Sequence, residues 1–156
     1  MQVAVGYVRM NRLRAERCAQ AVELGYQLIS HISPAAITWA DLTVGENTFV
    51  SPGCVINPSA VIGSNVFLGA CSIVAHDCTV GDHCFFSDRV TLAGGVSIGP
   101  YCYLGTSATV RNHVNVARES VIGAGAVILA DTDERAVHMG QHAECLPITS
   151  DKLNLA

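Results

Sequence analysis

A histidine followed by an aspartate is the feature of this sequence best suited to chemistry. His76 and Asp77 stand in the run Val-Ala-His-Asp-Cys-Thr-Val-Gly-Asp. Histidine titrates near neutral pH, so it can take a proton from a hydroxyl group or an amine. A neighbouring carboxylate can fix the tautomer of the ring and stabilise the imidazolium that forms. The pair therefore predicts a general base, and the alternative is a solvated pair on the surface.

The other histidines give weaker signals. His83 is a candidate ligand contact, whereas His113 is expected to be a surface residue. Arg111 beside it could meet a phosphate group, although exposed arginines are mostly just solvated. His138 and His142 are four residues apart, but a metal site needs a third ligand that the sequence does not identify, so no metal is predicted.

A strict six-residue period must position these side chains. An apolar residue recurs at every sixth position from Val44 to Ile128, fifteen times without a slip, and the residue four places after it is small or β-branched. Neither an α-helix nor an ordinary strand has this period, which is typical of a solenoid of stacked short units. We expect a mainly β fold, a left-handed parallel β-helix of about five coils with eighteen residues in each.

The residues before the repeat predict a short strand–helix–strand unit. Residues 3–7 are expected to form a buried strand, and residues 27–30 a second one. Asn11 can cap a helix that runs to about Leu24, and Gly25 can end it. The residues expected on the wet side of this helix are Arg12, Arg14, Glu16 and Arg17.

Composition limits the class of protein. Half of the chain is apolar and only 14% is charged, so a prism with apolar outer faces is expected to hide one of them in an oligomer. The net charge of −4 argues against nucleic acid as a partner. No apolar run is long enough to span a membrane, and no signal peptide is visible. The seven cysteines include no CxxC pair, so reduced thiols in the cytoplasm are expected.

The repeat resembles that of the hexapeptide acyltransferases, which mostly move acyl groups from coenzyme A to sugars or small amines. The order Val-Gly-Tyr, arginine-rich helix, Gly-Tyr-Gln-Leu-Ile-Ser and His31-Ile-Ser-Pro resembles the sialic acid O-acetyltransferase-like sugar acetyltransferases. In that group a Rossmann-like nucleotide-sugar domain precedes the β-helix, and only its last part has a counterpart here. We therefore expect a truncated α/β unit at 1–31, the β-helix at 32–130 and a C-terminal tail at 131–156.

The resemblance implies roles for individual residues. His76 falls at the catalytic base of the family, and Asp77 at the acidic residue that holds the imidazole. Gly94 matches the glycine whose N–H binds the thioester carbonyl oxygen, and it should stack one coil, about 4.8 Å, from His76. Gly6 matches a glycine near the sugar, and Phe85 stands where some relatives have a second histidine. The positions that match the binding of the pantetheine arm are Gly105, Thr106, Gly123 and Ala124.

The activity implied by the resemblance is acetyl transfer from acetyl-CoA to an amino or hydroxyl group of a sugar, expected to be nucleotide-linked. The acceptor attacks the thioester directly, with His76 as base, in a homotrimer with its sites at the subunit interfaces. One alternative is a catalytically idle acyltransferase remnant with a structural or CoA-binding role. Another is a zinc enzyme of the γ-carbonic-anhydrase type, but the prism contains no His-x4-His pair.

Overall fold

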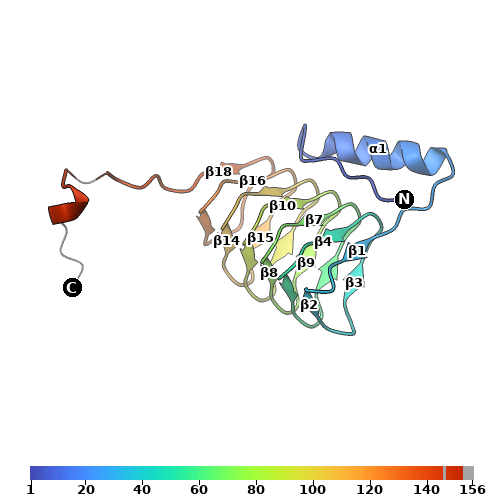
Figure 1. Cartoon of the computed structure of the whole chain (residues 1–156), viewed down its shortest axis with the longest axis horizontal. Helices are drawn as coiled ribbons and strands as arrows, with labels where there is room; N and C mark the ends of the chain where they lie inside the picture. Colours follow the sequence, from blue (N-terminus) through green and yellow to red (C-terminus); the bar gives the residue numbers. More distant parts are fainter. Residues whose placement is uncertain (146, 153–156) are drawn as a thin grey trace.

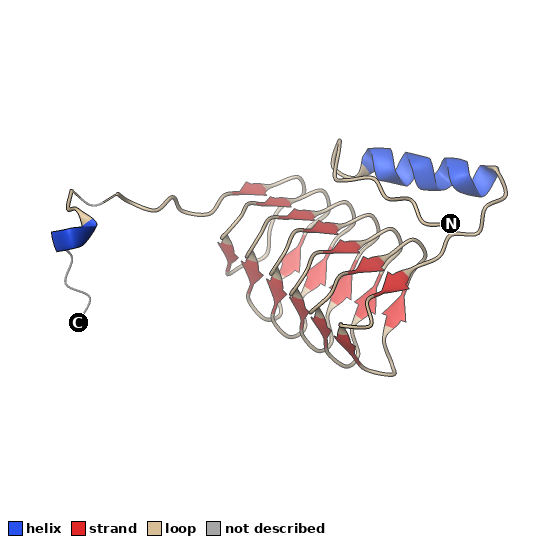
Figure 2. Ribbon diagram, viewed as in Figure 1, coloured by secondary structure: helices blue, strands red, loops and turns tan. Residues whose placement is uncertain are grey.

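The computed structural model of the protein describes residues 1–145 and 147–152. It is a parallel β-solenoid whose two-residue strands alternate among three sheets, with one helix, α1 (Arg12–Glu23), lying along its side (Figures 1 and 2). A 3-10 helix, η1 (Ser150–Lys152), follows the solenoid. The mainly β solenoid predicted from the six-residue period is confirmed.

From β1 to β15 the chain visits the three sheets in turn, so that each coil contributes one strand to each sheet, and β16, β17 and β18 then add strands to sheets A, B and A. Sheet A is ordered β1 (His31–Ile32), β4 (Phe49–Val50), β7 (Phe67–Leu68), β10 (Phe85–Phe86), β13 (Tyr103–Leu104), β16 (Val121–Ile122) and β18 (Val137–His138). Sheet B is ordered β17 (Val127–Ile128), β14 (Thr109–Val110), β11 (Thr91–Leu92), β8 (Ile73–Val74), β5 (Val55–Ile56) and β2 (Ile37–Thr38). Sheet C is ordered β15 (Asn115–Val116), β12 (Ser97–Ile98), β9 (Thr79–Val80), β6 (Val61–Ile62) and β3 (Thr43–Val44).

The solenoid has about six turns rather than the predicted five. Paired residues are eighteen positions apart, as in Phe49 and Phe67, until the last pair in sheet A, where Val121 meets Val137. The extra turn comes from strands at both ends, outside the strict period. An end coil is covered on one side only, so an apolar residue at the period position is not required there: the position is taken by the exposed Thr38 in β2, and Ile32 in β1 is 41% exposed.

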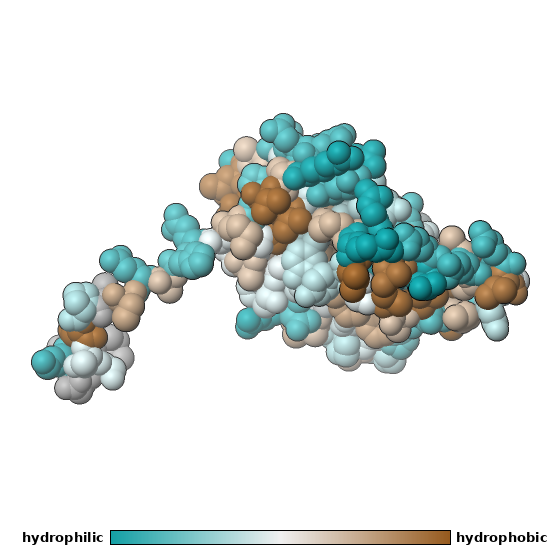
Figure 3. All heavy atoms as spheres, turned by 90° about the horizontal axis from the view of Figure 1, so that it is seen from above, coloured by the Kyte–Doolittle hydropathy of each residue, from teal (hydrophilic) through white to brown (hydrophobic). Residues whose placement is uncertain are grey.

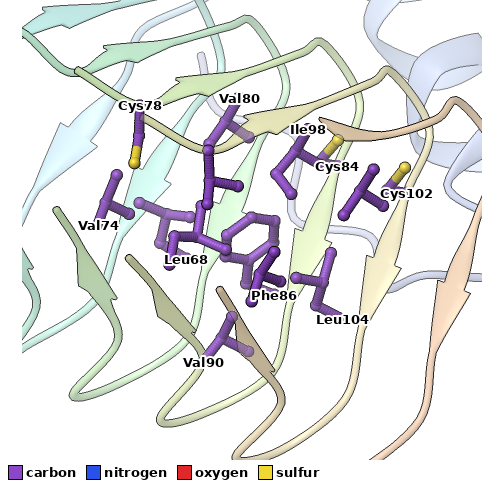
Figure 4. Packing of buried hydrophobic residues seen from close by; sticks show 14 of the residues in the cluster. Leu68, Val74, Cys78, Val80, Cys84, Phe86, Val90, Ile98, Cys102 and Leu104 are labelled. Carbon is purple, nitrogen blue, oxygen red and sulfur yellow. The ribbon is translucent and has the colours of Figure 1, made fainter. Parts of the chain in front are cut away.

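The second residue of most strands points into the prism and makes its core. The apolar residues of the six-residue period are buried from Val50 to Ile128, whereas Val44 in the first coil is half-buried. The small residues four places later are buried as well, and Figure 4 shows Cys84 and Cys102 side by side in successive coils. Each buried aliphatic side chain contributes about 1.5–3 kcal/mol, so the regular stack carries most of the stability.

The strands are joined by tight turns that form three corners, named here A–B, B–C and C–A after the sheets they connect. A left-handed residue closes most turns, for example Asp77 (φ 59°), His83 (φ 62°) and His113 (φ 58°). Asn, Asp and His tolerate this conformation better than most residues with a side chain. Because equivalent turns stack in register, residues eighteen apart form columns along each corner.

Residues 1–30, called the N-terminal arm, contain α1 but not the two predicted strands. The ends of the arm run side by side, with hydrogen bonds from Met1 N to Gln27 O (2.7 Å) and from Ile29 N to Met1 O (2.9 Å). The backbone N–H of Val3 instead donates to the side chain of Asn47 (2.7 Å). A side chain of the prism thus takes the hydrogen bond that a strand partner would need.

Helix α1 agrees with the prediction in its extent but not in which of its sides is exposed to solvent. Gly25 follows it with φ 83° and donates its N–H to Val22 O (2.9 Å), as expected of a helix end. Asn11 is at the N-cap but its side chain makes no capping bond. Arg14, predicted to be solvent-exposed, is only 4% exposed because it packs against the outer side of the prism over the ring of Phe85, whereas Leu24 is 77% exposed. Figure 3, a view from the side of α1, shows hydrophilic and hydrophobic groups interspersed.

Candidate active site

His76 and Asp77 form a pair at the B–C corner, in the turn between β8 and β9. His76 Nδ1 lies 2.8 Å from Asp77 Oδ2, and the two side chains are 64% and 66% exposed. A carboxylate can only accept a hydrogen bond, so this contact assigns the shared proton to Nδ1. Nε2 is then left as the atom that can take a proton from a substrate.

Gly94 stands one coil beyond His76 and directly against its ring. Gly95 N donates to His76 O (2.9 Å), which fixes the register of the two turns. A Cβ placed on Gly94 would be 2.7 Å from both Cε1 and Nε2 of His76. Among the hydrogen bonds of the described residues, the N–H of Gly94 has no acceptor. The structure therefore brings three of the predicted residues together, with an open backbone donor beside the free ring nitrogen.

The four positions predicted to bind the pantetheine arm lie at the A–B corner, away from His76. Gly105 and Gly123 are stacked, and a Cβ on Gly105 would be 2.6 Å from the nitrogen of Ala124. Thr106 and Ala124 are exposed. The structure thus places these four residues close to one another. Within one chain, however, sheet B lies between them and the B–C corner.

Gly6 is placed on yet another side of the prism. It lines a cavity of about 420 Å³ between the N-terminal arm and sheet A, together with Arg14 and the stacked rings of Phe49, Phe67 and Phe85. His76 is not part of this lining. Phe85 packs against Phe67 and does not lie at the B–C corner.

A polar column at the C–A corner was missed by the sequence analysis. Asn47, Asn65 and His83 are eighteen residues apart and hydrogen-bonded in series, with 2.9 Å from Asn47 Nδ2 to Asn65 Oδ1 and 2.9 Å from Asn65 Nδ2 to His83 Nδ1. Arg14 donates to the carbonyl oxygens of Asn65 (2.5 Å) and Cys84 (3.0 Å). The eighteen-residue spacing of polar residues was the available signal.

Burial acts on two titratable groups of this column. It lowers the pKa of Arg14 to about 10, so the guanidinium remains charged at neutral pH. It also lowers the pKa of His83, with a smaller opposing effect from Asp82. Because His83 Nδ1 accepts from Asn65, the geometry favours the neutral ring with its proton on Nε2.

His113, predicted to be a surface residue, is exposed and lies in the B–C corner near the candidate site. It stands eighteen residues after Gly95, and a Cβ on that glycine would be 2.5 Å from His113 Nδ1. No group of three or more His, Cys, Asp or Glu side chains in the described ranges is arranged to hold a metal ion. In the same ranges no helix has the length and apolar character needed to cross a membrane.

Comparisons with known proteins agree with the fold. The family described as Bacterial transferase hexapeptide (six repeats) matches residues 41–76, 59–94 and 77–112, which include the B–C corner turns of His76 and Gly94. A search of curated proteins finds no match.

Two solved structures are similar in both sequence and fold. GDP-perosamine N-acetyl transferase from Caulobacter crescentus, in complex with CoA and GDP-perosamine, is 32% identical with a TM-score of 0.82 over 83% of this chain. The acetyltransferase domain of PglB from Neisseria gonorrhoeae FA1090, also solved with acetyl coenzyme A, is 30% identical with a TM-score of 0.85 over 93%. The chain spans 62% of the length of the Caulobacter enzyme and 69% of the Neisseria domain.

A third structure shares the fold alone. AntD, an N-acyltransferase from Bacillus cereus in complex with dTDP and coenzyme A, is 14% identical with a TM-score of 0.65. The solenoid, the hexapeptide match and the likeness to the Neisseria domain lead to one conclusion: the chain belongs to the hexapeptide-repeat acyltransferase family.

Proposed function

We propose that the protein is an acetyl-CoA-dependent acetyltransferase that acts on an amino or hydroxyl group of a nucleotide-linked sugar. The observation that carries this proposal is the contact of the His76–Asp77 pair with Gly94, whose N–H has no acceptor among the described residues. A base and an oxyanion donor side by side are what direct attack on a thioester needs. The ligands of the similar enzymes support the substrate class.

The reaction follows from the positions of these groups. Asp77 accepts from Nδ1 and orients the ring, so Nε2 takes the proton of the acceptor as it attacks the acetyl carbonyl carbon. The negative charge that develops on the carbonyl oxygen is met by the N–H of Gly94. No covalent acetyl-enzyme is required, because the acceptor itself is the nucleophile.

We propose further that the site is completed between copies of the chain in a homotrimer. The A–B corner carries the residues matched to coenzyme A, while the B–C corner carries His76, so a second copy must bring the two corners together. The outer face of sheet B supports such a contact, since Ile37, Ile73 and Val127 on it are 58%, 40% and 61% exposed. An apolar face of this kind is favourable to bury.

The test is a thioester-cleavage assay with acetyl-CoA and a panel of nucleotide-linked amino and hydroxy sugars. Wild type and His76→Ala are compared at equal concentration. We expect turnover with at least one sugar and a loss of at least about 100-fold in the variant. Binding of acetyl-CoA without turnover of any acceptor would contradict the proposal and favour an idle remnant.

A further inference from the structure

His113 lies in the same corner as the proposed base but has no role in the reaction described so far. The backbone N–H of His113 donates to Gly94 O (3.0 Å), so the turn of His113 is stacked on the pair Gly94 and Gly95. Its ring folds down onto Gly95, where a Cβ would be 2.5 Å from Nδ1 and 2.9 Å from Cε1. The ring is exposed to solvent in the single chain.

Two imidazoles thus approach one glycine pair from opposite directions along the prism. His76 lies against Gly94 from the preceding coil, and His113 lies against Gly95 from the following one. A side chain at either glycine would displace a ring. A thioester held at the N–H of Gly94 would therefore have one imidazole on each side.

The residues matched to the pantetheine arm of coenzyme A indicate which of the two imidazoles lies on the side of the thioester sulfur. Thr106 and Ala124 come later in the solenoid than Gly94, so they lie toward its C-terminal end at about 4.8 Å per coil. In a closed ring of identical subunits with parallel prisms, equal coils lie at equal heights. Coenzyme A then extends from Gly94 toward the coil of His113, and the acceptor lies on the side of His76.

We propose that His113 stabilises the departing thiolate of coenzyme A, an inference that rests on the proposed function. As the acceptor attacks, its proton passes to His76 Nε2 and the new carbon–nitrogen or carbon–oxygen bond forms. The carbon–sulfur bond breaks and its electron pair goes to sulfur. A ring N–H of His113 donates a hydrogen bond to this sulfur and stabilises the thiolate, which then takes its proton from solvent to give the free thiol. His76 is exposed, so it releases to solvent the proton that it took from the acceptor.

The backbone of the corner offers clean variants for a test. His113 has φ 58°, a conformation that glycine adopts without strain and asparagine tolerates, so His113→Gly removes the ring and His113→Asn leaves a neutral donor. Ser59 is exposed at the same corner with φ 62°. Ser59→Gly is therefore a matched control for the change of backbone freedom.

The experiment first measures the affinity for free CoA by calorimetry. The ionisation of the bound CoA thiol is then followed as a function of pH through the absorbance difference between thiolate and thiol. In His113→Gly we expect the thiol to ionise about one pH unit higher than in wild type, a tenfold change, with a smaller change in His113→Asn. Ser59→Gly should match wild type. With a working acceptor, kcat of His113→Gly should fall at least about 10-fold without a matching rise in KM for acetyl-CoA.

The outcomes separate this inference from the proposed function. If CoA does not bind the wild type, both fall. If CoA binds but its thiol ionises alike in wild type and His113→Gly, the role of His113 is overturned while acetyl transfer stands. A rise in KM alone would show that His113 only holds the coenzyme, which also overturns the inference.

Discussion

Gly94 matters to the candidate site because of the side chain that it lacks. Its φ is not in the left-handed region, so the requirement for glycine is steric and comes from His76, whose ring atoms would be 2.7 Å from a Cβ. The clashing atoms are the end of an exposed side chain, which can swing away at little cost in stability. The same swing would take Nε2 from its position beside the backbone donor.

Gly94→Ala is therefore expected to lower kcat while leaving the melting temperature nearly unchanged. A displacement of the base by about 1 Å can cost about 100-fold in rate. Gly95→Ala provides the contrast, because φ 69° adds backbone strain of about 1 kcal/mol and should lower the melting temperature. Full activity of Gly94→Ala would show that the contact with His76 is not used in catalysis.

His83 predicts a pH dependence of stability at the C–A corner. Burial lowers its pKa from 6.5, so between its lowered pKa and pH 6.5 the folded protein binds fewer protons than the unfolded chain. Stability therefore rises with pH through this window and falls as the solution is acidified below about pH 6.5. Asp82 favours the charged ring, whereas Arg14, from the helix packed above, opposes it.

His83→Asn should reduce this dependence, since asparagine continues the column of Asn47 and Asn65 and tolerates φ 62°. Because the ring is only half-buried, we expect a modest effect, about 1–3 °C less loss of melting temperature between about pH 7.5 and about pH 5. Thermal unfolding of both proteins across this range is the measurement. Parallel pH curves would mean that another group sets the acid limit.

At the scale of elements, the N-terminal arm is attached to the prism by polar contacts. Asn47, 4% exposed, uses its side chain to bind both the N–H of Val3 (2.7 Å) and its carbonyl oxygen (3.3 Å). Arg14 and Asn11 reach carbonyl oxygens of the prism from α1, at 3.0 Å from Cys84 and 3.4 Å from Cys102. A few residues of one corner thus decide where the helix lies.

Asn47→Gly is expected to release the first residues of the arm without opening the prism. Glycine accepts φ 52°, so the variant isolates the loss of the side-chain bonds, each worth about 1 kcal/mol. Hydrogen exchange at residues 1–6 should become about 10- to 100-fold faster, while the strands of sheet B stay protected. Ser59→Gly is the control, and unchanged exchange at Val3 would refute the anchoring role.

The same elements show where sequence reasoning succeeds and where it stops. The six-residue period predicts the solenoid because every inward position has one environment, and a single slip would expose a whole set of apolar residues. It therefore also places His76 and Gly94 in adjacent turns. The arm has no such period, and its position depends on long-range bonds such as Arg14 to Cys84 O, seventy residues apart. A propensity pattern carries no information on those bonds, so Arg14 was assigned to the wrong side.

At the scale of the molecule, one chain carries the two halves of the proposed site on different corners. The B–C corner holds His76 and Gly94, and the A–B corner holds Thr106 and Ala124. A rigid prism cannot fold these corners together, because sheet B lies between them. The proposed site therefore requires that the A–B corner of one copy faces the B–C corner of another.

This arrangement predicts that two inactive variants restore each other's activity. His76→Ala removes the base, and Thr106→Trp obstructs the position matched to the pantetheine arm, from an exposed site and without entering the core. In randomly mixed trimers a site works when an intact His76 comes from one variant and an intact Thr106 from the other. A closed trimer that contains both variants has one such site among its three, so the purified mixed trimers should show about one third of wild-type activity. Co-expression with two affinity tags and purification of the mixed trimers provides the sample. Activity no higher than that of the separate variants would place both halves in one chain and exclude a shared site.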